Sequence, residues 1–339
     1  MAENQTIVSP SVSVIIPCRN EEKTIHLVLE ALRQQTFPID ELEVIIADGF
    51  STDGTRHAIQ SYAESNPALK IRLVDNPKKI IPAGLNTAIK AASGQIIVRM
   101  DAHSLPELDY VERCVNALQA DLAENVGGVW IISPRNGSWM ARSIAAAAAN
   151  PLAVGDAHYR FTNKAAYVDT VPYGAYKREL FDKIGLFDES LLANEDYEFN
   201  TRIRQSGGRI WLDPAIRCTY FARPDLKALA KQYWGYGYWK AQMLKRYPDT
   251  IRWRQALPPL FVLGVFLLAI LGLFWRPAWI VLGSVIALYL VIQLIPAISI
   301  ARRQQDLKLS FGILLATLTM HFAWGSALIV GLISKPDRK

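Results

Sequence analysis

Cysteine is scarce in this sequence, with only three residues in a chain of 339. Cys18, Cys114 and Cys218 are odd in number and widely spaced, so they indicate neither a disulfide framework nor a Cys-x-x-Cys metal pair. Free cysteine usually packs as a small hydrophobic residue. We therefore expect three buried free thiols in a reducing cytosol.

The first 250 residues also lack an excess of charge of either sign, since 28 lysines and arginines accompany 29 aspartates and glutamates. Residues 251–339 hold nine basic side chains and two aspartates, so the basic character of the chain originates there. This distribution does not indicate nucleic-acid binding and suits an anionic membrane surface. Residues 1–6 show no basic segment before an apolar run, so we expect no signal peptide and a cytosolic first domain.

Long apolar stretches fill the C-terminal part of the chain. Residues 257–275 carry no charge, residues 277–301 contain Gln293 as their strongly polar group, and residues 309–334 contain His321 as a possible charge. Each stretch has the roughly 20 apolar residues that are needed to cross a hydrocarbon core. The sequence therefore predicts three membrane-embedded helices. We expect His321 to serve hydrogen bonding between helices rather than proton chemistry.

The charges that flank these stretches predict their orientation. The positive-inside rule places residues 1–256 and 301–309 in the cytoplasm of a bacterial inner membrane, with the turn at Arg276 outside. The basic flanks are Arg252, Arg254, Arg302, Arg303 and Lys308. Three full crossings would put the basic tail 335–339 outside, against the rule, and the alternative is a re-entrant third segment.

A segment rich in aromatic residues, 226–256, precedes the first apolar stretch. Aromatic platforms with interleaved basic residues bind single-stranded nucleic acid in some proteins. The adjacent apolar stretches favour a helix that lies at the membrane interface instead. The aromatic side chains are Tyr233, Trp234, Tyr236, Tyr238, Trp239, Tyr247 and Trp253.

Short apolar runs alternate with amphipathic ones in the expected catalytic domain, residues 1–225. The runs at 12–17, 42–47, 71–74 and 95–100 are typical of buried strands. Helical spacing of apolar residues occupies the intervals 22–35, 53–64 and 82–92. This alternation predicts an α/β fold with a mostly parallel sheet and helices on both faces.

Polar residues cluster where three of these strands end, at 17–22, 48–55 and 101–103. Each cluster alone is also compatible with ordinary turn and helix-cap chemistry. Ligands of such sheets bind at the carboxyl ends of the strands. Three clusters at one edge therefore predict a site for a cation or a polyhydroxyl ligand.

These segments, with Gly174 to Glu179 and Asn194 to Phe199, stand in an order that resembles glycosyltransferase family 2, with its A-type nucleotide-sugar-binding fold. The Asp-Ala-His triplet at 101–103 and the apolar C-terminal stretches most resemble the membrane glucosyltransferases of succinoglycan-type exopolysaccharide synthesis. The resemblance implies a nucleotide pocket and places Asp48 and Asp53 near the base and ribose. The other residues that it places in this pocket are Pro17, Arg19, Asn20 and Glu21.

Asp101 and His103 occupy the position of the family's Asp-x-Asp metal motif. The resemblance implies a divalent cation, Mn²⁺ or Mg²⁺, that bridges the sugar-nucleotide diphosphate. Imidazole in place of the second carboxylate favours Mn²⁺ over Mg²⁺. The alternative is that His103 is a hydrogen-bonding loop residue.

The resemblance also implies catalytic residues at 194–199, where Glu195 and Asp196 match the pair that supplies the general base. Inversion at the anomeric carbon needs a carboxylate to take the proton of the acceptor hydroxyl, and we expect Asp196 to do so. Glu195 would position the acceptor. Gly174 and Ala175 would let the chain approach the donor sugar or acceptor, and Arg178 would belong to the same loop.

Processive members of the family carry Gln-x-x-Arg-Trp, and this chain keeps Gln232 without the Arg-Trp pair. Trp239 and Lys240 would either contact a sugar and a diphosphate or anchor the chain at the interface. The resemblance implies single, inverting transfer of a hexose, glucose from UDP-glucose, to a polyprenyl-diphosphate-linked oligosaccharide. A processive polysaccharide synthase and a non-catalytic membrane scaffold are the alternatives, and no nucleic acid partner is expected.

Overall fold

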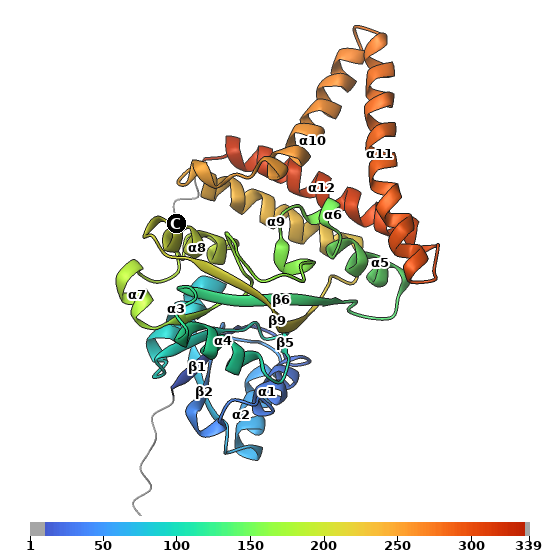
Figure 1. Ribbon diagram of the computed structural model, residues 1–339. Coiled ribbons are helices and arrows are strands. Elements are labelled where there is room, and N and C mark those ends of the chain that lie inside the picture. Colours follow the sequence, from blue (N-terminus) through green and yellow to red (C-terminus); the bar gives the residue numbers. More distant parts are fainter. Residues whose placement is uncertain (1–10, 336–339) are drawn as a thin grey trace, which may run out of the picture. The chain divides into compact units, whose positions relative to one another are not determined.

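The computed structural model describes residues 11–335, and the chain divides into two compact units (Figure 1). The first unit comprises residues up to Ile131 together with Thr162–Tyr220. The second comprises Ile132–Phe161 together with the chain from Phe221 onward. The expected start of the catalytic domain at 1–10 and the tail residues 336–339 lie outside the described residues.

Four parallel strands form one half of the sheet in the first unit, in the order β3-β2-β1-β4. Their register places Val14 of β1 opposite Val44 on one side and Val98 on the other. The parallel strands are β1 Val12–Cys18, β2 Leu42–Asp48, β3 Lys70–Asp75 and β4 Ile96–Arg99. The connecting elements are α1 Ile25–Arg33, η1 Ile39–Glu41, α2 Thr55–Ser65 and α3 Ile81–Ala91. This order of strands and helices confirms the predicted α/β alternation. The strands form where apolar, often β-branched, residues follow one another.

Further strands, which no sequence pattern marked, extend the sheet with antiparallel pairs to nine strands within the described residues. β8 lies antiparallel to both β4 and β6, and β9 lies antiparallel to β5 and β7. The strands are β5 Leu105–Pro106, β6 Asn125–Ser133, β7 Ala166–Tyr167, β8 Ala175–Lys177 and β9 Ile210–Phe221. The helices of this part are α4 Tyr110–Gln119, α7 Glu179–Ile184 and α8 Glu195–Gln205. Gly128 allows a close backbone approach here, because an added Cβ would collide with the carbonyl of Ile216.

The core of the first unit lies between the parallel strands and their helices, where Ile16, Leu29 and Val44 are fully buried. Cys18, Cys114 and Cys218 are buried in the same core as free thiols. The prediction of three buried, unpaired cysteines is therefore confirmed.

The second unit is helical. Its elements are α5 Trp139–Ala148, α6 Pro151–Val154, η2 His158–Arg160, α9 Leu226–Leu244, η3 Pro248–Thr250, α10 Trp253–Gly272, α11 Pro277–Arg303 and α12 Leu309–Ile333. The alanine-rich α5 packs against α12, and a Cβ added at Gly312 would collide with Ser143. Small residues on both helices allow this contact, which explains why residues 132–161 join the second unit although we expected them in the catalytic domain.

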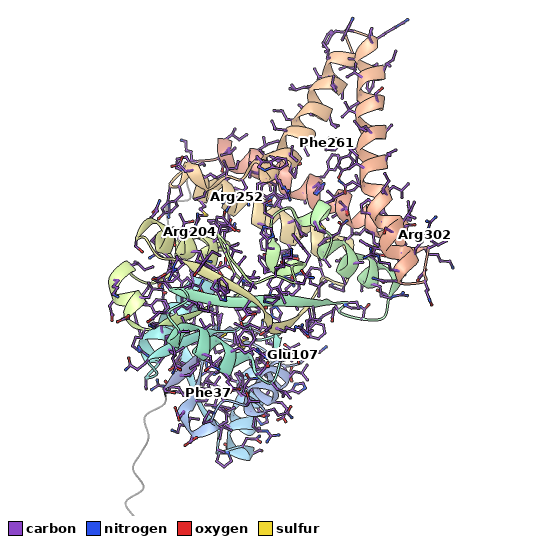
Figure 2. The ribbon with its side chains drawn as sticks, in the orientation of Figure 1. Phe37, Glu107, Arg204, Arg252, Phe261 and Arg302 are labelled. Atoms are coloured by element: carbon purple, nitrogen blue, oxygen red, sulfur yellow. The ribbon has the colours of Figure 1, made fainter. Side chains whose placement is uncertain are left out.

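Three helices, α10 to α12, are long and apolar enough to cross a membrane. α10 and α11 run as a hairpin, with Phe261 of α10 labelled within it and Arg302 at the end of α11 (Figure 2). The Phe261 ring stacks on Tyr289 at 4.2 Å between ring centroids. His321 of α12 contacts the Tyr289 hydroxyl at 2.8 Å and the Ala153 carbonyl at 3.2 Å. The interpretation of His321 as a residue that hydrogen-bonds between helices is therefore confirmed.

Candidate active site

The loops after β1 and β2 are tied together by the first two polar clusters. The backbone N–H of Asn20 donates to Ser51 Oγ at 2.8 Å, and the N–H of Thr52 donates to Asn20 Oδ1 at 2.8 Å. Asn20 takes a left-handed backbone conformation (φ 56°) and so does Phe50 (φ 53°). Residues held in such sparsely populated conformations cluster at functional sites.

The carboxylates of these loops are already engaged by the protein. Asp48 is fully buried and accepts from Ser51 Oγ at 2.5 Å and from Arg56 Nη1 at 2.9 Å. Asp53 accepts from Thr55 Oγ1 at 2.5 Å, and this hydrogen bond lowers the pKa of Asp53. The two aspartates therefore shape the loop, and their contact with a base or ribose stays a prediction. Arg56, which also pairs with Asp75 at 2.8 Å, was not indicated by any sequence pattern.

Arg19 is the available cation of this edge. Its side chain is exposed and lies along Gly49, where an added Cβ would come within 3.2 Å of Arg19 Cδ. Among residues 11–335 no hydrogen bond or ion pair engages its guanidinium, and Pro17, two residues before it, is half-buried. The position suits a side chain that meets an anionic ligand.

Arg99, the last residue of β4, connects two of the predicted clusters. The side chain is buried, and its Nη2 lies 2.8 Å from Glu195 Oε1 and 3.5 Å from Asp101 Oδ1. Its Nε and Nη1 have no hydrogen-bond partner within the described part of the chain. No motif indicated Arg99, although a charge inside the apolar run 95–100 was a signal that a buried anion had to be nearby.

Glu195 and Asp196 begin α8, directly after Asn194 in a left-handed conformation (φ 65°). Asp196 is half-buried and accepts from the backbone N–H of Tyr197 at 2.7 Å. Burial raises the pKa of both carboxyls, while the positive charge of Arg99 acts in the opposite direction. A carboxylate with a raised pKa is a stronger base, which suits proton abstraction from a hydroxyl.

The later residues of the segment 194–199, Glu198 and Phe199, have a structural role. Glu198 binds Arg202 through both carboxylate oxygens, at 2.7 and 2.9 Å. Arg202 in turn donates to the Leu186 carbonyl at 2.7 Å, and Phe199 stacks on Phe181 with ring centroids 5.3 Å apart. These contacts hold the start of α8 in position.

Gly174 and Ala175 lie beside β4 at its carboxyl end. Gly174 has φ +83°, its carbonyl accepts from the Arg99 N–H at 2.9 Å, and an added Cβ would collide with the Tyr176 hydroxyl. Ala175 is buried in β8 opposite Val98. The structure does not bring Arg178 to this edge, since its Nε donates to the Gly94 carbonyl at 2.7 Å, before β4 begins.

Asp101, His103 and Glu21 are the side chains that could meet a divalent cation. Each is about one quarter exposed, and His103 Nδ1 lies 3.2 Å from Glu21 Oε1. No group of three or more His, Cys, Asp or Glu side chains within residues 11–335 is arranged to hold a metal by itself. Mn²⁺ and Mg²⁺ are commonly held by one or two side chains plus substrate phosphates. The partly exposed Asp101 and His103 fit an ion of that kind.

A family model described as glycosyl transferase family 2 matches residues 13–185, which include Asp48, Asp101 and Gly174. The chain belongs to this family. A succinoglycan biosynthesis protein, ExoA of Rhizobium meliloti (strain 1021), is 32% identical over 74% of this chain and 76% of its own length. The chain is therefore a family 2 glycosyltransferase of glycan synthesis.

Two further proteins resemble this glycosyltransferase over nearly its whole length. A dolichyl N-acetyl-alpha-D-glucosaminyl phosphate 3-beta-D-2,3-diacetamido-2,3-dideoxy-beta-D-glucuronosyltransferase of Methanococcus voltae is 28% identical over 93% of this chain and 95% of its own. The solved mannosyltransferase PcManGT of Pyrobaculum calidifontis, in complex with GDP-Man and Mn²⁺, has a TM-score of 0.62 at 23% identity. It covers 92% of this chain and 87% of its own, which confirms the A-type fold.

Three predicted site residues of this glycosyltransferase lie on α9 in the second unit. Gln232 Nε2 donates to the Tyr236 hydroxyl at 2.9 Å, and the Trp239 ring meets Tyr238 edge to face. Lys240 is buried, and its Nζ donates to the Thr250 carbonyl at 3.1 Å. In this arrangement Lys240 holds α9 against η3, so contact with a diphosphate would require that bond to open.

Proposed function

We propose that this glycosyltransferase adds a single hexose, glucose from UDP-glucose, to a polyprenyl-diphosphate-linked oligosaccharide in exopolysaccharide synthesis, with inversion at the anomeric carbon. The observation that carries the proposal is the cluster of Arg99, Asp101, Glu195 and Asp196 at the carboxyl end of β4. In this cluster Asp101 is a partly exposed carboxylate that would meet a cation-bound diphosphate. Asp196 is a carboxyl with a raised pKa that would take the proton of the acceptor hydroxyl.

The proposed roles follow from these contacts. Asp196 takes the proton of the attacking hydroxyl, and Glu195, held by Arg99, positions the acceptor. Arg19 meets the donor diphosphate. A divalent cation held by Asp101 and His103 would neutralise charge on the leaving nucleoside diphosphate. The buried Arg99 holds the Glu195 carboxyl in place through its 2.8 Å contact, and its positive charge opposes the rise in the pKa of Glu195 that burial causes.

The lipid-borne acceptor is supported by the helices α10 to α12, which are suited to membrane attachment. A plasma-membrane protein with its catalytic domain in the cytoplasm would find a polyprenyl-linked acceptor at the bilayer surface. The names of two relatives point the same way, since one takes part in succinoglycan biosynthesis and the other acts on a dolichyl-linked sugar.

The direct test is transfer of radiolabelled glucose from UDP-glucose to membrane lipid extract by the purified protein in lipid vesicles with Mn²⁺. We expect label in the organic phase that mild acid releases, as a polyprenyl diphosphate linkage requires. One added hexose per acceptor would support single transfer, whereas a ladder of products would support a processive synthase. Transfer to soluble sugars alone would contradict the lipid acceptor, and UDP binding without transfer from any donor would favour a scaffold.

The cation preference tests the role of His103. We expect activity with Mn²⁺ at least equal to that with Mg²⁺, because imidazole is a softer ligand than carboxylate. The substitution His103→Asp should shift the ratio of the two activities toward Mg²⁺. His26→Asp on the exposed surface of α1 is the matched control and should leave the ratio unchanged. A strict Mg²⁺ preference of the wild type would contradict His103 as a ligand.

A further inference from the structure

We propose that α12 lies along the membrane surface beside α9 and does not cross the bilayer, so that the chain crosses only twice, through α10 and α11. The outer face of α12 would contact the boundary between lipid headgroups and acyl chains. The proposal concerns the second unit alone, and it stands or fails independently of the sugar that is transferred.

The helix α9 cannot cross a hydrocarbon core. Lys227, Lys231 and Lys245 are exposed along its length, and Lys240 is buried against Thr250. A lysine ammonium in the middle of a bilayer is strongly unfavourable unless it is paired or reaches the interface. Four lysines spread over 19 helical residues and the position that follows them place α9 at the surface.

The helix α12 is attached to α9 along most of its length. Leu229 and Tyr233 of α9 share a buried cluster with Ile313, Ala316 and Met320 of α12. This cluster forms the first part of the contact between the two helices.

Further along, the two backbones approach closely. A Cβ added at Gly237 would collide with the Trp324 carbonyl, and one added at Gly331 would lie 2.6 Å from Ala241 Cβ. Gln242 Nε2 donates to the Gly331 carbonyl at 3.0 Å. Lys245 Nζ donates to the Ser334 carbonyl at 2.5 Å.

The contacts advance together in both helices, so α9 and α12 run parallel over about 24 Å of α9, from Leu229 to Lys245. A helix fixed in this way to a surface helix stays at the same depth. The burial of the three helices agrees with a surface position for α12. In the most apolar 18-residue stretch of each helix, 39% is buried within the protein in α12, against 11% in α10 and 17% in α11.

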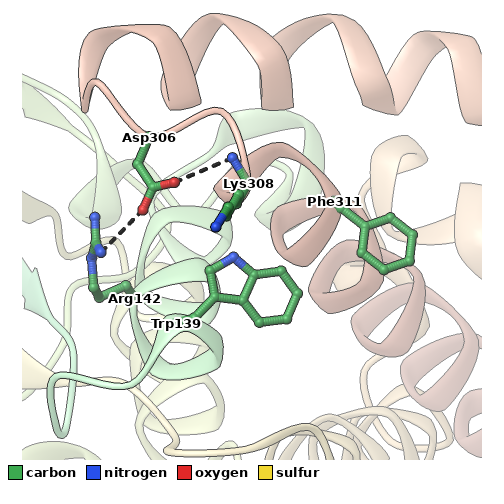
Figure 3. Close-up of a pocket in the computed structure, with 5 residues that line it drawn as sticks. All are labelled: Trp139, Arg142, Asp306, Lys308 and Phe311. Carbon is green, nitrogen blue, oxygen red and sulfur yellow. Dashed lines mark hydrogen bonds and ion pairs between the residues drawn. The ribbon is translucent and has the colours of Figure 1, made fainter.

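The start of α12 is fixed as well. Asp306 accepts from the Lys308 backbone N–H at 3.2 Å and pairs with Arg142 of α5 at 3.1 Å (Figure 3). Trp139 and Phe311 line the same shallow pocket (Figure 3). The turn between α11 and α12 is therefore held against α5.

Lipid is the partner that the outer face of α12 fits. Phe311 is 59% exposed and Ile333 is 80% exposed, and Phe322 and Leu332 are also exposed. The helix carries no lysine, arginine, aspartate or glutamate that would suit water. Arg302 and Lys308 flank the turn before it, where headgroup phosphates would attract them. α12 has no charged face of its own, so the polar side of this interfacial pair is supplied by the lysines of α9.

The hairpin is placed so that it rises from the level of α12. A Cβ added at Gly325, in the second half of α12, would lie 2.8 Å from the Pro258 carbonyl near the start of α10. Ala297 and Ala301 at the end of α11 share a buried cluster with Leu309 at the start of α12. Figure 1 shows α10 and α11 projecting from the layer formed by α9 and α12.

Two crossings also reconcile the charges with the positive-inside rule. They leave Arg276 alone on the far side and return the chain after Ile333, with Lys335, to the side of the N-terminal domain. Three crossings would place Lys335 opposite Arg302 and Lys308, against the rule.

Labelling of single cysteines in the full chain, in sealed right-side-out and inverted vesicles, tests the number of crossings. The introduced residues are Trp275→Cys, Gln304→Cys, Lys335→Cys and, as a control on α2, Glu64→Cys. We expect a membrane-impermeant maleimide to label position 275 in one orientation and the other three in the opposite orientation. The native cysteines are buried, which raises the pKa of their thiols and keeps the background low. Labelling of positions 335 and 275 from the same side would overturn the proposal.

A depth measurement separates a surface helix from a re-entrant one. Phe311, Phe322 and Ile333 are exposed and eleven residues apart, so they lie on nearly one face, about three helical turns from each other. Each would be replaced by cysteine, labelled with a fluorophore and quenched by lipids brominated at defined depths. We expect similar, shallow depths at all three positions. A crossing or re-entrant helix would place position 322 up to about 16 Å deeper than the other two, and that result would overturn the proposal.

Discussion

Replacing Asp196 with asparagine is expected to lower the rate of glycosyl transfer by about 10²–10⁴-fold, the contribution of a positioned general base. The amide has nearly the shape of the carboxylate and can still accept from the Tyr197 N–H, so the start of α8 should be preserved. The measurement is the initial rate of transfer at saturating UDP-glucose, together with the affinity for UDP. Unchanged UDP affinity would show that the donor pocket is intact.

Asp182→Asn provides the matched control, because Asp182 is an exposed aspartate on α7 of the same unit. This variant should keep the wild-type rate. If Asp196→Asn retained more than about one tenth of the wild-type rate, Asp196 would not be the base.

The acidic limb of the pH–rate profile offers a second readout of the same residue. A general base acts only when it is deprotonated, so the rate falls as the pH falls through its pKa. Burial raises the pKa of Asp196, and the limb should therefore lie above the pKa of an ordinary aspartate. The residual activity of Asp196→Asn should lack this limb.

Replacing Arg99 with methionine is expected to lower the free energy of unfolding by about 3–5 kcal/mol, because it leaves the Glu195 carboxylate buried without its partner. The same change should abolish transfer, since Glu195 and Asp101 lose the cation that orients them. Thermal or denaturant unfolding of the detergent-solubilised protein measures the first effect, and the radiolabel assay measures the second.

Two variants test the cause of this loss. Arg33→Met removes an exposed ion pair with Glu30 and should leave the stability nearly unchanged, because solvent screens such pairs. The double variant Arg99→Met/Glu195→Leu removes both buried charges and should recover much of the stability without recovering transfer. A double variant as unstable as Arg99→Met would show that loss of packing, rather than an unpaired carboxylate, causes the effect.

The parallel half of the fold was predictable because its signals are local. Apolar runs mark β1 to β4, and the periodicity of the intervals marks the helices between them. In the antiparallel half, β5, β7 and β8 were not predictable, because they are only two or three residues long and owe their pairing to distant partners, whereas the longer β6 and β9 were not marked in the sequence. Strands this short carry no periodicity of their own.

The candidate site divides in a similar way. Asp101, Glu195 and Asp196 were predicted from motifs, but Arg99, which connects them, was not. Its role depends on a contact across 96 residues of sequence. Conversely, Arg178 and Lys240 matched expected positions, yet their side chains bind the backbone carbonyls of Gly94 and Thr250.

The sequence by itself determined the α/β domain, the family, the polar clusters at the strand ends and the apolar C-terminal helices, because each depends on residues close together in the chain. Only the tertiary structure decided which carboxylates lie beside the Arg99 guanidinium, and that the alanine-rich α5 packs against α12. It also decided that α12 packs along α9. Length and apolarity are properties of a segment, whereas the depth of a helix in a membrane depends on what it is packed against, and for α12 that partner is a helix with four lysines along it and at its end.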